Sequence, residues 1–124
     1  MNMSFILIDD DNISNFINER IIRMEYPDAE ITPFTNPLKG IEYISANLAQ
    51  KSILFLDINM PEMTGWEFIE HITKINLNII ENLNIYILSS SIEPSDIEKV
   101  KNNSSIVDFV EKPLTTKFLA SLKN

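Results

Sequence analysis

A short apolar run that ends on a single carboxylate limits the possible folds of this chain more than any other feature. Residues 53–56 are Ile, Leu, Phe and Leu, Asp57 follows them, and Pro61 and Gly65 come soon after. Such a run predicts a strand buried on both faces, as in the middle of a parallel sheet. Asp57 would then lie at the carboxyl end of the strand, where open α/β sheets bind ligands. An Asp here can also form a turn or cap a helix, and the rest of the chain decides between these interpretations.

Further strands are predicted on both sides of this run. Phe5 to Ile8 is a second short apolar run that also ends on carboxylates. The complete set of predicted strands covers residues 4–9, 30–34, 53–57, 84–88 and 106–110. Pro33 cannot donate a hydrogen bond to a neighbouring strand, so the segment 30–34 is expected near an edge of the sheet.

Between the strands the apolar residues take helical spacing. The first helix is predicted by steps of three and four between Ile13, Phe16, Ile17, Ile21 and Met24. Asp11 or Asn12 can cap this helix. The second helix has Pro37 at its first position, and Gly65 leads into the third.

Two shorter helices are predicted near the end of the chain. Pro94 begins the fourth helix, in which Ser95 and Glu98 have the spacing of a capping box. The last helix begins near residue 115, and its predicted inner face consists of Phe118, Leu119 and Leu122.

The alternation of five strands with five helices predicts an α/β fold. Repeated right-handed crossovers give one parallel sheet with helices on both faces, which is a three-layer sandwich. The flavodoxin-like, doubly wound strand order 2-1-3-4-5 would make the first and third strands neighbours. The length of 124 residues suits one domain. We expect residues 1–124 to form that domain with no attached output domain.

Polar residues follow four of the five predicted strands. Asp9 and Asp10 follow the first, Asp57 ends the third, Ser89 follows the fourth and Lys112 follows the fifth. The carboxyl ends of parallel strands lie at one edge of the sheet, so these side chains are expected to converge. Each of them alone also suits an ordinary role as a helix cap, a loop residue or a solvated charge.

The combination of these side chains points to phosphoryl chemistry. Three carboxylates in one crevice repel one another, so some protonate or a cation lies among them. Oxygen ligands with room for water suit Mg²⁺, and Mn²⁺ accepts the same ligands. Lys112 and Ser89 would stabilise the oxygens of a phosphoryl group on an attacking carboxylate. Aspartate is an established phosphoryl acceptor, and phosphoryl transfer needs mainly positioning and charge neutralisation.

Composition excludes several classes of function. The chain has no cysteine, which removes disulfides and thiolate sites and fits a reducing, cytoplasmic location. The N-terminus lacks the features of a signal peptide, and no apolar run is long enough for a membrane helix. The net charge of -8 argues against nucleic acid as a partner and leaves a divalent cation or a basic protein surface.

Four motifs together resemble the response-regulator receiver domain, the CheY-like family of two-component signalling. They lie in order on the expected strands, and the resemblance covers essentially the whole chain. The motifs are Ile8-Asp9-Asp10, Leu56-Asp57-Ile-Asn-Met-Pro61 with Gly65, Leu88-Ser89-Ser90, and Phe109-Val-Glu-Lys112-Pro113.

The resemblance implies a role for each matching residue. Asp57 would accept a phosphoryl group, and Asp9 and Asp10 would hold Mg²⁺ with it and with the backbone carbonyl of Asn59. Lys112 would pair with the phosphoryl oxygens, and the bond that follows it is often cis in the family. Ser89 and Phe109 would take part in switching. Asn59 and Ser91 would set the lifetime of the phosphorylated state.

Three features depart from the usual family pattern. Ser89 replaces the commoner threonine, and Phe109 replaces the commoner tyrosine, so a signal read through a phenol hydroxyl is absent. The segment 73–84 is longer than the usual link between the third helix and the fourth strand. Its residues 73–82 either extend that helix or form a separate turn.

The resemblance implies a phosphoacceptor rather than an enzyme, with self-phosphorylation or self-dephosphorylation as its only activity. Its partners would be a sensor histidine kinase or a histidine phosphotransfer protein and a separate effector, with the chain a monomer or weak dimer. One alternative is an interaction module that is not phosphorylated. Another is a haloacid-dehalogenase-like phosphatase, but that family has a second Asp where this chain has Asn59, and it usually needs a cap insertion.

Overall fold

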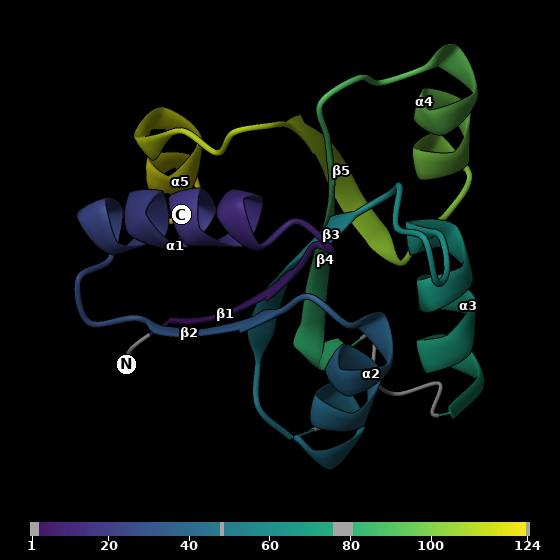
Figure 1. The fold of residues 1–124 in the computed structure, drawn as a ribbon, viewed down its shortest axis with the longest axis horizontal. Helices are drawn as coiled ribbons and strands as arrows, with labels where there is room; N and C mark the ends of the chain where they lie inside the picture. The colour runs from purple at the N-terminus through teal and green to yellow at the C-terminus, as the bar shows by residue number, and fades with distance from the viewer. Residues whose placement is uncertain (1–2, 48, 76–80, 124) are drawn as a thin grey trace.

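Strands and helices alternate along the chain, as the sequence predicts (Figure 1). The computed structural model describes residues 3–47, 49–75 and 81–123. The elements are β1 Ser4–Ile8, α1 Asn12–Glu25, β2 Glu30–Phe34, α2 Pro37–Ala46, β3 Ser52–Asp57, α3 Gly65–Ile75, β4 Leu83–Ser89, α4 Pro94–Lys101, β5 Ile106–Glu111 and α5 Thr116–Ser121. Each strand begins and ends within about one residue of its prediction, which is the accuracy expected at element ends.

The five strands form one parallel sheet in the order β2-β1-β3-β4-β5. This confirms the predicted doubly wound order and makes β1 and β3 neighbours. Every residue of β1 and β3 is buried, because both strands lie inside the sheet and helices cover both faces. β2 lies at one edge and carries Pro33, as predicted.

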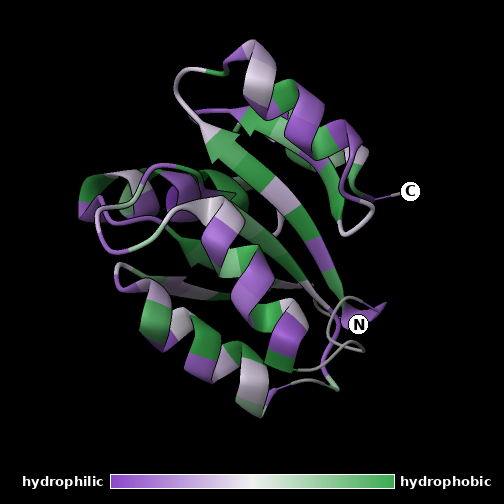
Figure 2. Ribbon diagram, turned by 90° about the vertical axis from the view of Figure 1, so that its right-hand side faces the viewer, coloured by the Kyte–Doolittle hydropathy of each residue, from purple (hydrophilic) through white to green (hydrophobic). Residues whose placement is uncertain are grey.

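Two helical layers cover the sheet. α1 and α5 lie on one face, and α2, α3 and α4 lie on the other (Figure 1). One core cluster joins residues of β1, β3 and β4 with α2, α3 and α4, and a second joins the opposite face of the sheet with Ile22 of α1 and Leu119 of α5. The strands between these layers are mostly hydrophobic, and the helices alternate between hydrophobic and hydrophilic residues (Figure 2).

Helix α1 buries polar residues and exposes apolar ones. Its buried residues are Asn15, Asn18 and Ile22. Ile13, Phe16, Ile17 and Met24, whose spacing predicts the helix, are between 43% and 73% exposed. The predicted helix is therefore correct, but these apolar residues do not form its buried face.

Side-chain caps begin α1, α2, α3 and α5. Asp11, rather than Asn12, caps α1 and accepts a hydrogen bond of 2.9 Å from the Ile13 N–H. Asn36 caps α2 in the same way, and Thr115 caps α5 with its hydroxyl. At α3 the Thr64 hydroxyl accepts the Glu67 N–H at 3.1 Å, and the Glu67 carboxylate accepts the Thr64 N–H at 2.9 Å. Such caps satisfy backbone N–H groups that have no partner within the helix.

The predicted capping box of α4 is wrong. The box is formed by Glu93 and Asp96, and the Glu93 N–H donates to the Asp96 carboxylate at 3.2 Å. Pro94 fixes this position, because proline lacks an N–H and suits the first turn of a helix. The cap therefore falls on Glu93, and Ser95 lies inside the helix.

A β-bulge at Val107 changes the face on which the rest of β5 lies. Ile85 pairs with Ile106, but Tyr86 pairs with Asp108, so Val107 has no counterpart in β4. Alternation alone would place Asp108 on the same face as Ile106. The extra residue instead turns Phe109 toward that face, where it packs against the core beneath α2, α3 and α4.

One sequence prediction depends on the segment after α3. This helix ends at Ile75, and residues 76–80, which decide whether the segment 73–82 extends it, lie outside the described residues.

Among the helices of the described ranges, none has the length and apolar character needed to cross a membrane.

Candidate functional site

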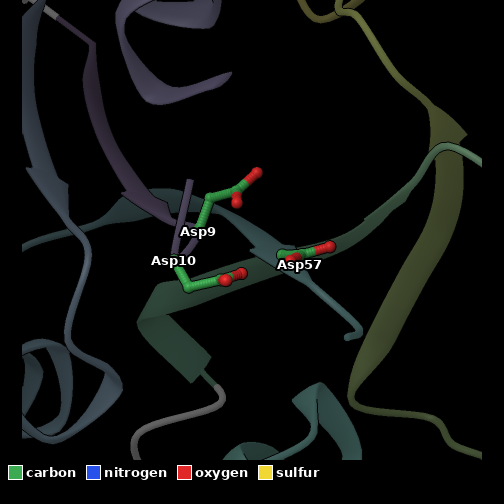
Figure 3. Close-up of side chains that lie close together, drawn as sticks. All are labelled: Asp9, Asp10 and Asp57. Carbon is green, nitrogen blue, oxygen red and sulfur yellow. The ribbon is translucent and has the colours of Figure 1, made fainter. Parts of the chain in front are cut away.

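Three carboxylates meet where β1 and β3 end (Figure 3). Asp9 and Asp10 follow β1, and Asp57 is the last residue of β3. One carboxylate oxygen from each lies within 4.8 Å of the other two. The predicted convergence of these three carboxylates is therefore present, and it results from the pairing of β1 with β3.

The three carboxylates differ in burial and in their partners. Asp9 is 1% exposed and Asp57 is 5% exposed, while Asp10 is exposed to solvent. Asp9 Oδ1 accepts a hydrogen bond of 2.9 Å from the Asp11 N–H. The cluster therefore has a fixed, buried floor and one side open to solvent, as a partly hydrated cation requires.

Lys112 supplies a positive charge to this cluster. Its ammonium lies 2.6 Å from Asp9 Oδ2 and 3.2 Å from Asp57 Oδ1. Its backbone N–H donates to the Ser89 carbonyl at 2.9 Å, which joins the ends of β4 and β5. The Lys112–Pro113 peptide bond is cis, as the resemblance implies.

The electrostatics of the site leave Asp57 easier to protonate than a free aspartate. Burial, and then the negative charge of Asp9, raise the pKa of Asp57 to about 6, although Lys112 opposes this shift. Burial lowers the pKa of Lys112, but its hydrogen bond to Asp9 and the charges of Asp57 and Asp9 outweigh burial, so its pKa is raised. The lysine therefore stays charged near neutral pH, and Asp57 ionises within reach of it.

Ser89 lies at the end of β4 and is 2% exposed. Its hydroxyl donates to the Ser91 carbonyl oxygen at 2.6 Å and accepts from the Ser91 N–H at 3.1 Å. The side chain is thus held in the turn after β4. Asp57 pairs with Leu88 in the sheet, so Ser89 is one residue beyond the level of Asp57.

Asn59 and Ser91 are both exposed, and each lies two residues beyond a buried site residue. The Ile58 carbonyl, just before Asn59, accepts the Gly65 N–H at 2.8 Å, which closes the loop that leads to α3. A Cβ atom at Gly65 would lie 2.8 Å from the Asp57 carbonyl oxygen. Glycine is therefore required where this loop passes the backbone of Asp57.

Sequence reasoning missed Asn15 and Asn18, which lie beneath the site. The side-chain amide of Asn15 donates to the carbonyl oxygens of Asp9 and Phe34, and Asn18 Oδ1 accepts the Leu114 N–H. The signal that could have revealed them is their spacing. Asparagine is a poor helix former, and two of them three residues apart occupy one face of α1.

Comparisons with known proteins agree with this geometry. The family model described as the response regulator receiver domain matches residues 5–122. A two-component response regulator from Cytophaga hutchinsonii is 35% identical, with a TM-score of 0.91 over 100% of this chain and 96% of that one. A response regulator receiver protein from Dyadobacter fermentans is 25% identical, with a TM-score of 0.87 over 97% of this chain and 94% of that one.

A comparison with curated proteins gives the same result. A two-component response regulator of Arabidopsis thaliana is 27% identical over 128 aligned positions, which cover 95% of this chain and 80% of the relative. The family match spans nearly every element of the fold, from β1 to α5. The chain therefore belongs to the response regulator receiver domain family of two-component signalling.

Proposed function

We propose that Asp57 accepts a phosphoryl group and that the receiver domain is a switch controlled by this modification. The observation that carries the proposal is the buried Asp57 carboxylate at the end of β3, 3.2 Å from the Lys112 ammonium and beside Asp9 and Asp10. An Asp57 oxygen forms a bond to the phosphorus of a phosphohistidine, the phosphorus–nitrogen bond breaks, and the imidazole leaves with that electron pair. The domain is thus a phosphoacceptor rather than an enzyme.

The residues at the site fit a Mg²⁺ or Mn²⁺ ion. Asp9, Asp10 and Asp57 offer three oxygens within 4.8 Å of one another, and the Asn59 carbonyl would complete the protein ligands. The exposed Asp10 leaves a side on which a hydrated ion retains water. When bound, the cation neutralises charge on the carboxylates and on the phosphoryl oxygens.

Lys112 and Ser89 act on the phosphoryl group after transfer. The Lys112 ammonium already lies between Asp9 and Asp57, so it can pair with a phosphoryl oxygen on Asp57 with little movement. The Ser89 hydroxyl leaves its bond to Ser91 and donates to another phosphoryl oxygen. Both hydrogen bonds are charge-assisted and are therefore stronger than hydrogen bonds between neutral groups.

The movement of Ser89 carries the signal to the surface. Ser89 is followed by the loop that leads to α4, and Phe109 on the neighbouring strand packs against the core on the α4 side of the sheet. When Ser89 moves, Phe109 repacks, and the face formed by α4, β5 and α5 changes shape. A separate effector protein reads this face, and the domain acts as a monomer or weak dimer.

The phosphodonor is a sensor histidine kinase or a histidine phosphotransfer protein. Its docking surface is the exposed apolar side of α1, because this helix begins directly after the acidic pair and presents Ile13, Phe16 and Ile17 to solvent. A surface of this kind on a soluble domain favours a partner with an apolar face of its own.

Asn59 and Ser91 set the lifetime of the phosphorylated state. The resemblance to the receiver family implies that these positions border the path of a water molecule that attacks the phosphorus, and both residues are exposed. Substituting either residue is expected to change the rate of dephosphorylation. An unchanged rate for both variants would refute this role.

Intact-mass measurement after incubation with acetyl phosphate tests the proposed function. We expect a gain of one phosphoryl group with Mg²⁺, no gain with EDTA, and no gain in Asp57→Asn under either condition. Labelling that survives in Asp57→Asn would refute Asp57 as the acceptor. If the wild-type protein is not labelled and does not bind Mg²⁺, the chain is an interaction module that is not phosphorylated.

A further inference from the structure

Asn15 and Asn18 connect α1 to both sides of the ion pair between Asp9 and Lys112. The Asn15 amide donates to the Asp9 carbonyl at 3.1 Å and to the Phe34 carbonyl at 3.0 Å. Asn18, one helical turn later, accepts the Leu114 N–H at 3.1 Å. Both asparagines are fully buried. The same face of one helix therefore holds the backbone of Asp9 and the backbone that follows Lys112.

The segment from Lys112 to Leu114 is fixed at both ends. At its start, the Lys112 N–H donates to the Ser89 carbonyl at 2.9 Å. At its end, the Leu114 N–H donates to Asn18, and the Leu114 side chain is buried in the core with Ile22. The side chain that reaches Asp9 and Asp57 therefore starts from a backbone held on one side by β4 and on the other by α1.

An asparagine at position 18 is costly unless its side chain has a specific role. A buried amide loses its hydration, and asparagine is a poor helix former compared with leucine. A leucine at this position would leave the buried Leu114 N–H without its acceptor. Because the α1 backbone is rigid, the Asn18 oxygen gives that N–H a fixed place.

We propose that Asn18 is a positioning residue for Lys112. By holding the Leu114 N–H, Asn18 sets where the Lys112 ammonium lies relative to the carboxylates of Asp9 and Asp57. Its effect on phosphoryl transfer rests on the proposed function, but its effect on the position of Lys112 does not. Small displacements of a charged group at such a site lower rates strongly.

The position of Lys112 can be measured without any phosphodonor. The ¹³Cε and ¹⁵Nζ signals of Lys112 are recorded in metal-free protein and assigned by their absence in Lys112→Arg. We expect Asn18→Leu to move these signals toward the values of a solvated lysine. Asn18→Ala removes the same acceptor without adding bulk, and it decides the question if Asn18→Leu does not fold. The matched control is Ile22→Val, on the same buried face of α1, which should leave the Lys112 signals in place.

The rate of labelling by acetyl phosphate gives a second, independent readout. We expect the Asn18 variants to lose roughly ten-fold in rate per folded molecule, while Ile22→Val stays close to wild type. In a Lys112→Ala background, removing Asn18 should cause no further loss, because the group on which it acts is absent. Such non-additivity distinguishes positioning from a general loss of structure.

Two outcomes would overturn this inference. One is that the Lys112 signals of Asn18→Leu and Asn18→Ala coincide with those of the wild-type protein. The other is that removing Asn18 lowers the rate equally with and without Lys112. Absence of labelling in the wild-type protein would instead count against the proposed function, and the Lys112 signals would still decide whether Asn18 positions Lys112.

Discussion

The Ser89 hydroxyl donates a hydrogen bond of 2.6 Å to the carbonyl oxygen of Ser91. A hydroxyl has one hydrogen to donate, and here the turn after β4 uses it. To donate to a phosphoryl oxygen on Asp57, Ser89 has to release the Ser91 carbonyl. The loop before α4 therefore cannot keep its geometry when Ser89 responds to a charge at Asp57.

Replacing Ser89 should separate phosphorylation from the structural response. We expect Ser89→Ala to be labelled by acetyl phosphate, because Asp57, Lys112 and the acidic pair remain. The ¹H–¹⁵N signals of residues 89–93 and of Phe109 should change much less on labelling than in the wild-type protein. Ser89→Thr retains the hydroxyl and serves as the control. If Ser89→Ala shows the full wild-type changes, Ser89 does not couple the site to the loop.

The raised pKa of Asp57 predicts how metal-free stability depends on pH. Burial, followed by the charge of Asp9, raises this pKa from 3.8 to about 6. Between these values the folded protein binds the proton and the unfolded chain does not, so the free energy of unfolding falls as the pH rises. Above pH 6 the loss is complete and amounts to roughly 3 kcal/mol, because each tenfold change in proton affinity corresponds to about 1.36 kcal/mol.

Asp57→Asn should remove this penalty. At pH 8 we expect the free energy of unfolding of the variant to exceed that of the wild-type protein by about 2–3 kcal/mol. At pH 4 the two proteins should have nearly the same free energy of unfolding. Urea denaturation of both proteins in EDTA measures the difference, and other titrating groups largely cancel. A stability difference that is the same at both pH values would contradict the raised pKa.

Mg²⁺ should stabilise the wild-type protein at pH 8, because binding to the folded state adds to the free energy of unfolding. An ion at the proposed site would relieve repulsion among Asp9, Asp10 and Asp57, one oxygen of each lying within 4.8 Å of the others. The same concentration should stabilise Asp57→Asn less, since one charged ligand is lost. The denaturation midpoint as a function of Mg²⁺ concentration measures both effects. Equal stabilisation of the two proteins would place the ion elsewhere.

The sequence predicts the sheet and its acidic edge well, because both depend on local patterns. Continuous apolar runs identify β1 and β3, and their pairing alone brings Asp57 to Asp9 and Asp10. The bulge at Val107 could not be predicted, because it depends on how β5 pairs with β4 and leaves no local signal. The direction in which Phe109 points therefore requires the structure.

The buried face of α1 could not be read from its apolar residues. Hydrophobic spacing assumes that a helix buries its apolar side. In α1, Asn15 and Asn18 instead bind backbone groups at the ends of β1 and β2 and in the segment between β5 and α5, and this requirement outweighs burial of Phe16. The cap of α4 depended likewise on Pro94, which excludes Ser95 as the first residue.

The orientation of α1 predicts a small loss of stability at one apolar residue and a large loss at another. Phe16→Ser should change the free energy of unfolding by no more than about 0.5 kcal/mol, because Phe16 is 61% exposed. Ile22→Ala should cost about 2–5 kcal/mol, because Ile22 is completely buried. Urea denaturation measures both.

Phe16→Ser also tests the proposed docking surface for the phosphodonor. Labelling by acetyl phosphate should be unchanged, because a small donor needs no protein surface, whereas transfer from a phosphohistidine protein should slow. Ile17→Ser is a second variant on the same exposed side. A large loss of stability in Phe16→Ser would show that α1 is turned the other way.

Gly65 and Gly40 offer a matched pair for testing how closely the loop after β3 passes Asp57. A Cβ atom at Gly65 would lie 2.8 Å from the Asp57 carbonyl oxygen and 3.2 Å from Ile58 Cα, both backbone atoms. At Gly40 it would lie 2.6 Å from Ile8 Cδ1, the end of a side chain that can move. Gly65→Ala should therefore cost about 1–3 kcal/mol, whereas at Gly40 the gain in helix propensity, about 1 kcal/mol, offsets the contact.

The two variants should differ in function as well as in stability. Gly65→Ala displaces the backbone of Asp57, so its labelling by acetyl phosphate should fall in the folded protein. Gly40→Ala lies within α2 and meets the movable end of the Ile8 side chain rather than the backbone of Asp57, so it should be labelled at the wild-type rate. Thermal denaturation and labelling at saturating Mg²⁺ measure both effects. If Gly65→Ala is as stable and as readily labelled as Gly40→Ala, the loop has room to move away from Asp57, and the glycine is not required there.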